Sequence, residues 1–129
     1  MALFVKQDFI MHSGGIASYK IDCDALSDED IETLAFIISE KGKFSRVVGV
    51  PRGGMRLANA LKKYVSGVGP TLIVDDVLTT GASMEEAREK LNDPKAVGIV
   101  IFARKQPASW IKPLFEMTFF NTEDRFDNE

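Results

Sequence analysis

Two adjacent carboxylates, Asp75 and Asp76, stand between an apolar run at residues 71–74 and a loop of small and hydroxyl-bearing residues. The loop reads Thr79-Thr80-Gly81-Ala82-Ser83. Small residues allow backbone N–H groups to close around an anion, and the hydroxyl groups offer further donors. A helix that begins near Ser83 adds the partial positive charge of its N-terminus. The loop is therefore predicted to bind a terminal phosphate group.

The acidic pair is informative because of this neighbouring loop. Two carboxylates so close to a phosphate would repel it, so Asp75 and Asp76 are predicted to bind hydroxyl groups or a divalent cation. A phosphate loop beside a site for a diol and a metal describes a pocket for ribose 5-phosphate. The alternative interpretation is an ordinary strand end with solvated acids, followed by a helix cap rich in hydroxyl groups. The unbroken run of small and hydroxyl-bearing residues at 79–83 argues against that interpretation.

A second loop of related character lies one helix earlier in the chain and reads Gly49-Val50-Pro51-Arg52-Gly53-Gly54. It also follows an apolar run and leads into an expected helix. Arg52 carries a planar array of donors that suits phosphate oxygens. This turn alone would be an ordinary connection, but its place one strand–helix unit before the acidic pair predicts a second anion site. Arg56, one helical turn on, is expected to be solvated or paired.

Other phosphate-binding chemistries fit the sequence less well. A Walker loop needs Gly-x4-Gly-Lys-Ser/Thr and a dinucleotide fingerprint needs Gly-x-Gly-x-x-Gly, and both patterns are absent. An Asp-x-Asp pair for phosphoryl transfer is absent too, because Asp75 and Asp76 are adjacent.

The elements that must position these residues alternate along the chain. Three runs are apolar on both faces rather than at every second residue, at 47–50, 72–74 and 97–102. Strands of that kind usually lie in parallel sheets that helices cover on both sides. With helices between the runs, the pattern predicts an α/β fold with a Rossmann-like, mostly parallel sheet and helices on both faces. Ligands bind such sheets beyond the carboxyl ends of the strands, where both loops would lie.

The remaining elements have local signals. Ser27, with Asp30 three residues on, resembles a capping box before a helix. Two short strands are expected at 9–12 and 17–22, and a last one at 115–120.

Composition excludes several classes of protein. The 129 residues suggest a single domain, 1–129, and 45% hydrophobic with 27% charged residues suits a packed core. With a net charge of −3, the chain lacks the overall positive charge that would favour binding to nucleic acid or to an anionic membrane. Cys23 is the only cysteine, so no internal disulfide forms.

The longest apolar stretch, 96–103, is far below the roughly 20 residues that span a bilayer. With no signal-peptide pattern at the N-terminus, we expect a cytoplasmic protein with small-molecule substrates and neither nucleic acid nor membrane as partner.

The segment Thr71–Ser83 closely resembles the phosphoribosyl pyrophosphate signature of type I phosphoribosyltransferases, and all thirteen positions fit that pattern. The resemblance implies a minimal version of that family's fold, with phosphoribosyl pyrophosphate as co-substrate, Mg²⁺ as cofactor and a homodimer as the assembly. It implies that Asp75 and Asp76 are the catalytic acids, which contact the ribose hydroxyls and hold Mg²⁺ partly through the substrate.

The same resemblance assigns the two loops to the two anionic ends of the co-substrate. Its 5-phosphate would be wrapped by Thr79, Thr80, Gly81, Ala82 and Ser83. Its pyrophosphate would be bound by the loop that contains Pro51, Arg52 and Gly53. Such a site would act mainly by positioning and by electrostatic stabilisation of the departing charge.

The N-terminal segment Asp8–Asp22 looks like the orotate branch of the family. The resemblance implies that the strands within 1–25 form the pyrimidine side of the pocket and that His12 and Lys20 face the base. His12 stands where that branch often has lysine, and Lys20 where it often has an aromatic residue. Orotate or a related pyrimidine is therefore the first candidate base.

The resemblance leaves part of the chain unassigned. It places the core at 26–105 and says nothing of the tail 106–129. The aromatic residues of the tail are expected in the core or at a dimer surface: Trp110, Phe115, Phe119 and Phe120.

One segment departs from the family. Members carry a long mobile loop between the pyrophosphate-loop helix and the signature strand, whereas only Lys62–Pro70 fills that space here. An open site would slow transfer and permit hydrolysis of phosphoribosyl pyrophosphate. Lys62 and Lys63 either replace part of the lid's charge, for example across a dimer, or are solvated. Two functions therefore stay open: an Mg²⁺-dependent phosphoribosyltransferase, and a non-catalytic or regulatory module that binds phosphoribosyl pyrophosphate.

Overall fold

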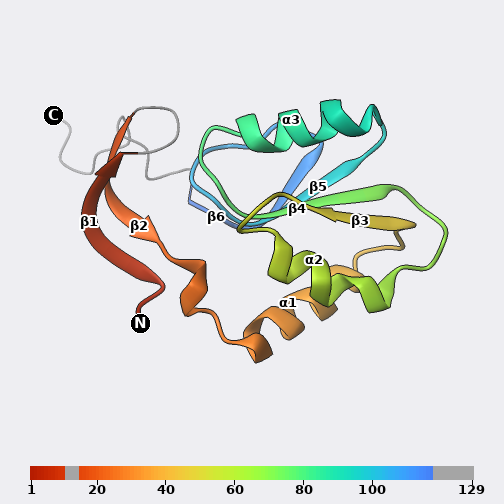
Figure 1. Cartoon of the computed structure of the whole chain (residues 1–129), viewed down its shortest axis with the longest axis horizontal. Helices are drawn as coiled ribbons and strands as arrows, with labels where there is room; N and C mark the ends of the chain where they lie inside the picture. The colour runs from red at the N-terminus through yellow and green to blue at the C-terminus, as the bar shows by residue number, and fades with distance from the viewer. Residues whose placement is uncertain (11–14, 118–129) are drawn as a thin grey trace, which may run out of the picture.

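Four parallel strands form a sheet at the centre of the molecule, and a separate two-stranded hairpin lies beside one end of it (Figure 1). The structure is a computed structural model that describes residues 1–10 and 15–117. The hairpin consists of β1 (Phe4–Ile10) and β2 (Ile16–Ile21). The rest follows in the order η1 (Cys23–Ala25, a 3-10 turn), α1 (Asp28–Ser39), β3 (Arg46–Gly49), α2 (Met55–Leu61), η2 (Lys62–Tyr64), β4 (Thr71–Leu78), α3 (Ala82–Leu91), β5 (Val97–Ala103) and β6 (Ile111–Glu116).

Helices cover both faces of the sheet, whose strand order is β3-β4-β5-β6. α1 and α2 pack on one face and α3 on the other (Figure 1). Leu72 and Val74 of β4 belong to the apolar cluster under α1 and α2, whereas Ile73 belongs to the cluster under α3. A strand buried in this way must be apolar on both faces. The predicted α/β architecture, a parallel sheet with helices on both sides, is confirmed.

The two helical crossovers of the sheet have opposite hands. The steps from β3 to β4 and from β4 to β5 run in the same direction across the sheet, yet α2 and α3 lie on opposite faces. Right-handed crossovers account for about 98% of such connections, so one of these two departs from the general preference. An alternation of strands and helices along the sequence does not reveal this.

The connection from α2 to β4 lies at the edge of the sheet where the strands begin. Ser45 N donates to Pro70 O, and Ser66 N donates to Phe44 O, each at 3.0 Å. The segment 62–70, which stands where the family carries its mobile loop, is therefore held at the amino ends of β3 and β4. It does not reach the carboxyl ends of the strands.

Lys62 and Lys63 follow α2 at this same amino-end edge. Lys63 pairs with Glu32 of α1, and its hydrogen bond to that carboxylate raises the pKa of the Lys63 ammonium. The two lysines therefore do not supply a lid's charge to the pocket of their own chain, and their replacing it across a dimer stays a prediction.

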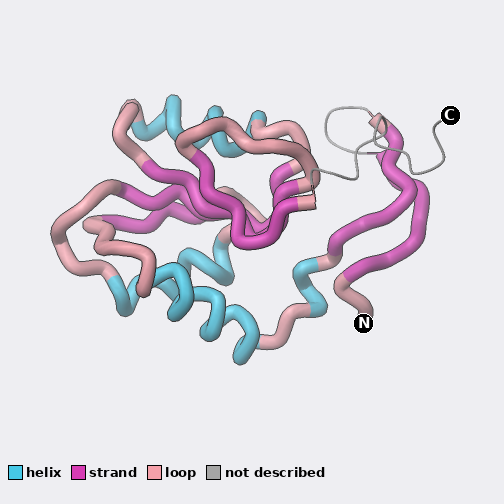
Figure 2. Tube along the Cα trace, turned by 180° about the vertical axis from the view of Figure 1, so that it is seen from behind, coloured by secondary structure: helices cyan, strands magenta, loops and turns pink. Residues whose placement is uncertain are grey.

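The hairpin stands beside the carboxyl ends of β4 and β5, which the view from behind also shows (Figure 2). Phe4 of β1 packs edge-on against Phe102 of β5, with 5.8 Å between ring centroids. Arg104 Nη1 donates to Tyr19 O of β2 at 2.9 Å. The two expected N-terminal strands are present, although the first begins earlier, at Phe4, and residues 11–14 lie outside the described part of the chain.

Arg56 of α2 ties the segment after the hairpin to the helical layer. It donates to Cys23 O at 3.3 Å and to Leu26 O at 2.9 Å, and it pairs with Asp28 at 3.0 Å. Of the two predicted states of Arg56, solvated or paired, the structure shows the paired one. Because α2 directly follows the loop that contains Arg52, these contacts of Arg56 hold the end of the hairpin in a fixed position relative to that loop.

The last strand begins earlier than the sequence indicated, at Ile111 instead of residue 115. Pro113 lies within it, which is possible because β6 is an edge strand and a proline there need not donate to a neighbour. Proline is a poor strand signal, and this is why the sequence pattern missed the first half of β6. Residues 118–129, which include the expected end of the strand, lie outside the described part of the chain.

The aromatic residues of the tail have different surroundings. Trp110 packs against the apolar cluster under α3, so the expectation of a core position is confirmed for it. Phe115 stacks on Phe102 with 5.2 Å between centroids and stays half exposed. Phe119 and Phe120 lie outside the described residues. Among the helices at 1–10 and 15–117, none is long and apolar enough to cross a bilayer.

α1 begins where the sequence placed its cap. Asp30 N donates to Ser27 Oγ at 3.0 Å, and Ser27 N donates to Asp30 Oδ2 at 3.1 Å. This reciprocal pair is a capping box in which aspartate takes the place of the usual glutamate. The cap sets the direction in which α1 turns Ile31, Ala35 and Ile38 into the core.

Replacing Ser27 by alanine should lower the free energy of unfolding by about 1 kcal/mol, because the N–H of Asp30 loses its acceptor. Ser27→Asp retains an acceptor and should stay close to wild type. Urea unfolding of the three proteins, followed by circular dichroism, measures the difference. An alanine variant as stable as wild type would show that the cap does not contribute.

Candidate functional site

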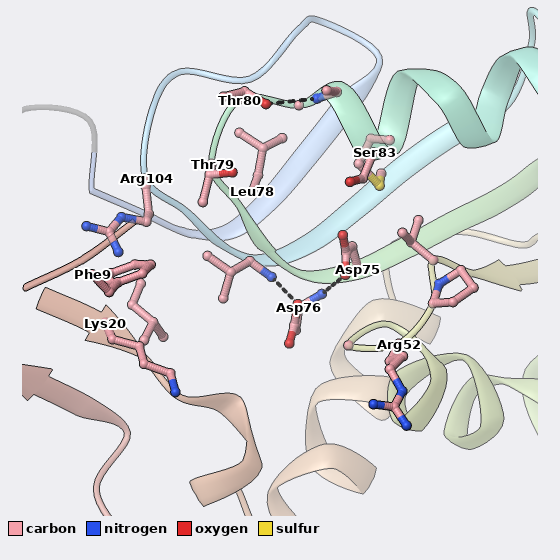
Figure 3. A pocket seen from close by; sticks show the side chains of 18 of the residues that line it. Phe9, Lys20, Arg52, Asp75, Asp76, Leu78, Thr79, Thr80, Ser83 and Arg104 are labelled. Carbon is pink, nitrogen blue, oxygen red and sulfur yellow. Dashed lines mark hydrogen bonds between the residues drawn. The ribbon is translucent and has the colours of Figure 1, made fainter. Parts of the chain in front are cut away.

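A pocket of about 500 Å³ opens between the carboxyl ends of the sheet strands and the hairpin (Figure 3). From the sheet side it is lined by residues 50–53, residues 75–84 and Arg104. The hairpin contributes Phe9, Ile10, Lys20 and Ile21. The residues that the resemblance assigned to the co-substrate all line this one pocket, together with Lys20: 51–53, 75–76 and 79–83. His12 lies outside the described residues, so its assignment to the base side stays a prediction.

β4 runs through both acids to Leu78, whereas the sequence pattern had ended the strand before Asp75. The two acids therefore point in different directions, because successive side chains of a strand alternate between its faces. In Figure 3, Asp75 points toward the start of α3 near Ser83, and Asp76 points the opposite way. Asp76 N donates to Asp75 Oδ1 at 2.8 Å, and Val77 N donates to Asp76 Oδ1 at 2.7 Å. Each carboxylate is therefore oriented by the backbone N–H of the next residue.

Asp75 is a buried acid, with 9% of the residue exposed. Desolvation, followed by the nearby charge of Asp76, raises the pKa of Asp75 to about 8. In the free protein the Asp75 carboxyl therefore keeps its proton to a much higher pH than an exposed aspartate does. A cation bound beside it would favour the ionised form, so the state of this acid depends on what occupies the pocket.

The loop between β4 and α3 has the geometry of an anion site. Gly81 has φ +90°, a conformation that residues with a Cβ rarely adopt. Ala82 N donates to Thr80 Oγ1 at 3.2 Å, and Thr79 and Ser83 line the pocket with their hydroxyl groups. The first N–H groups of α3 have no partner within the helix, and the helix N-terminus carries a partial positive charge. A phosphate group fits both properties.

The first turn of α3 is braced from behind. Trp110 Nε1 donates to Glu85 Oε1 at 2.6 Å. The Arg88 guanidinium lies over the Trp110 ring, 4.4 Å from its centroid, and donates to Glu85 Oε2 at 3.3 Å. These contacts hold the start of the helix against the segment that precedes β6, so the anion loop has a rigid support.

The loop after β3 is attached to β4 through its backbone. Val50 N donates to Val74 O at 2.9 Å, and Gly54 N donates to Val50 O at 2.8 Å. The Pro51–Arg52 peptide bond is cis. The side chain of Arg52 lies exposed at the rim of the pocket (Figure 3). This loop therefore presents one cation and its own backbone to the space in front of Asp76.

The hairpin end of the pocket contains residues that the sequence analysis missed. The Arg104 guanidinium stacks over Tyr19, 3.9 Å from the ring centroid, and lies 5.7 Å from that of Phe9. Lys20 lines the same end. Arg104 had a usable signal, because it directly follows the third run that is apolar on both faces and so falls on the same sheet edge as both loops. Phe9 had none, because an aromatic residue in a short strand is usually a packing residue.

The pocket suits a metal ion that arrives with a ligand. Among the described residues no group of three or more His, Cys, Asp or Glu side chains could hold a metal by itself. Asp75 and Asp76 are the acids among the residues that line the pocket. Mg²⁺ is commonly held by one or two carboxylates, with phosphate oxygens of the substrate and water in the other positions. The acidic pair fits that arrangement.

Comparison with known proteins identifies the fold. No family model and no curated protein matches the sequence, whereas solved structures do. Orotate phosphoribosyltransferase from Aeropyrum pernix has a TM-score of 0.71 at 22% identity, covering 89% of each chain. The Mycobacterium tuberculosis orotate enzyme in complex with phosphoribosyl pyrophosphate has a TM-score of 0.62 at 18% identity, covering 88% of each chain. Adenine phosphoribosyltransferase from Leishmania donovani has a TM-score of 0.63 at 9% identity, over 88% of this chain and 76% of that one. The chain has the type I phosphoribosyltransferase fold, as the resemblance implied.

Asp75→Asn should stabilise the free protein at alkaline pH, and this advantage should shrink as the pH falls. The folded chain binds the proton of Asp75 more tightly than the unfolded chain, because the pKa of about 8 lies far above the ordinary value of 3.8. Wild-type stability should therefore fall as the pH rises from about 4 through about 8, and asparagine escapes this loss because it does not titrate.

Thermal melts between about pH 4 and about pH 9, in the presence of a chelator, measure this difference. Glu89→Gln, on the exposed surface of α3, is the matched control, and its melting temperature should follow that of wild type. A gap between Asp75→Asn and wild type that does not change with pH would contradict the role given to the buried carboxyl.

Proposed function

We propose that this protein is an Mg²⁺-dependent phosphoribosyltransferase that joins an anionic pyrimidine, with orotate the first candidate, to phosphoribosyl pyrophosphate and releases pyrophosphate. The observation that carries the proposal is the arrangement around one pocket. A phosphate loop at 79–83, two acids in the second half of β4 and a second anion loop at 50–53 surround the same space. Their order matches the order of the 5-phosphate, the ribose hydroxyls and the pyrophosphate in the co-substrate.

Each part of the chain then has a defined task in the transfer. Residues 79–83 hold the 5-phosphate, and Asp76 with the ionised Asp75 binds the ribose hydroxyls. Residues 50–54 are called the pyrophosphate loop below. The Arg52 side chain and the backbone N–H groups of Arg52 and Gly53 stabilise the charge that builds up as the bond from C1 to pyrophosphate breaks. The reaction passes through an oxocarbenium-like state at C1, and the site acts mainly by positioning the base for the new C1–N bond.

Mg²⁺ would be held by Asp75, Asp76 and oxygen atoms of the co-substrate. When bound, it would neutralise part of the negative charge of the pyrophosphate. Ionisation of the Asp75 carboxyl, whose pKa is about 8 in the free protein, is favoured by that positive charge.

The choice of an anionic pyrimidine is supported by the hairpin end of the pocket. Lys20 and Arg104 bring two cations there, and Phe9 adds a flat apolar surface. A planar base that carries a carboxylate would use all three, whereas a neutral purine would bring no negative charge to the two cations. Orotate has this chemistry.

A non-catalytic module that binds phosphoribosyl pyrophosphate is the second candidate. It is favoured by the position of residues 62–70, which lie at the amino ends of the strands and leave the pocket uncovered from that side. A site that water can enter is poorly suited to an oxocarbenium-like centre, but it is adequate for binding. The assembly as a homodimer and the cytoplasmic location also stay predictions.

Asp76→Asn should weaken binding of phosphoribosyl pyrophosphate at least tenfold, about 1.4 kcal/mol, while the melting temperature stays nearly unchanged. Asp76 is half-buried and faces the pocket, so its charge serves the ligand more than the fold. Isothermal titration with phosphoribosyl pyrophosphate and Mg²⁺ measures the effect, with Asp93→Asn beyond α3 as the control. Equal affinity of Asp76→Asn and wild type would remove the central assignment.

Transfer should be slow, roughly 100-fold below that of an enzyme with a closing loop, since one positioned donor is commonly worth that much. Free ribose 5-phosphate should accompany the nucleotide product because water reaches the open site. Kinetics with orotate, uracil, adenine, guanine and hypoxanthine decide the matter. Tight binding without turnover would favour the regulatory module, and a product with purines alone would overturn the choice of base. Fast transfer without hydrolysis would show that the pocket does close.

A further inference from the structure

The pyrophosphate loop and the ribose-binding acid touch each other at Gly53. A Cβ added to Gly53 would lie 2.5 Å from Asp76 Cγ and closer still to both carboxylate oxygens. Real Cβ atoms do not come that close to other heavy atoms. Rotation of the carboxylate about its own axis would not relieve the clash, because both oxygens and the carbon are involved. A side chain at residue 53 would have to displace the Asp76 side chain as a whole or lift the loop.

The loop itself has little freedom to lift. Its two ends are fixed to β4 and to each other by the bonds from Val50 N to Val74 O and from Gly54 N to Val50 O, at 2.9 and 2.8 Å. Gly54 is buried, and a Cβ added there would clash with the carbonyl oxygen of Val74. Asp76 is the more mobile partner, because it is half-buried and held at one oxygen by the N–H of Val77.

Gly53 is required here by space and not by backbone conformation. The described glycines with a positive φ are Gly42, Gly67, Gly69 and Gly81, and Gly53 is not among them. Alanine can therefore adopt the backbone of residue 53 without strain. Residue 53 is also exposed, so an added methyl group does not disturb the core. What the methyl group would meet is the Asp76 carboxylate.

We propose that Gly53 is a positioning residue for ribose recognition: the missing side chain lets the pyrophosphate loop seat against Asp76 and holds that carboxylate toward the ribose hydroxyls. This inference rests on the proposed function, and it makes a statement that the function alone does not. A residue in the loop for one end of the co-substrate controls the binding of the other end. The two anion sites are joined through one packing contact and are not independent.

Ribose 5-phosphate distinguishes an effect on ribose binding from an effect on pyrophosphate binding, because it has no pyrophosphate. Gly53→Ala should weaken binding of ribose 5-phosphate at least tenfold in isothermal titration, although residue 53 belongs to the loop assigned to the pyrophosphate. Arg52→Ala, in the same loop but without an added group near Asp76, should weaken phosphoribosyl pyrophosphate and leave ribose 5-phosphate unchanged. Gly53→Ala that binds ribose 5-phosphate as wild type does would overturn the inference while the proposed function stands. Failure of wild type to bind either ligand would overturn both.

A double variant tests whether the effect passes through Asp76. Asp76→Ala removes the carboxylate that the new methyl group would strike. Adding Gly53→Ala to Asp76→Ala should then cause no further loss of affinity for ribose 5-phosphate, and an equal loss in both backgrounds would contradict the coupling. Melting curves establish that each variant is folded. A crystal structure of Gly53→Ala should show the Asp76 side chain displaced, and an unmoved carboxylate would refute the mechanism.

Discussion

The structure depends on the way β4 ends. This strand is buried on both faces by helices and on both edges by β3 and β5, and it then emerges with two acids at the carboxyl edge of the sheet. Its backbone also holds the neighbouring loops: Val74 O accepts from Val50 N, and Leu78 O accepts from Arg104 N at 2.9 Å. The loop after β3, the loop after β4 and the hairpin end of the pocket are therefore all attached to one strand.

Burial of Asp75 at this position lowers the stability of the folded protein when the carboxyl is ionised. A carboxyl group so close to the core has lost much of its water, and a second acid is its neighbour in the chain. In the free protein the acid can hold a proton, and under the proposed function it would exchange that proton for a cation when the pocket is filled. A buried acid with a raised pKa is a common feature of functional sites.

The short connection before β4 distinguishes this chain from the family pattern. It passes from α2 to β4 at the amino ends of the strands, and so gives two neighbouring crossovers of opposite hand. It also places no residue of 62–70 over the pocket. What remains around the site is the hairpin, held by Arg104 and by Phe4 against Phe102. The hairpin and the sheet edge together must provide whatever enclosure the described part of the chain offers.

The sequence by itself determined the α/β class, the cap of α1 at Ser27 and the two loops with their acids, because these rest on local patterns: runs apolar on both faces, capping residues, and small residues after a strand. It did not reveal the hand of the crossovers, the contact of Gly53 with Asp76, or Arg104 as part of the site. Those features join residues that are distant in the chain, and only packing brings them together. The start of β6 was missed for a local reason, since Pro113 is a poor strand signal until the strand is known to lie at an edge. Burial of Asp75 was likewise decided by the tertiary structure, because the same Asp-Asp pair in an exposed strand would be solvated.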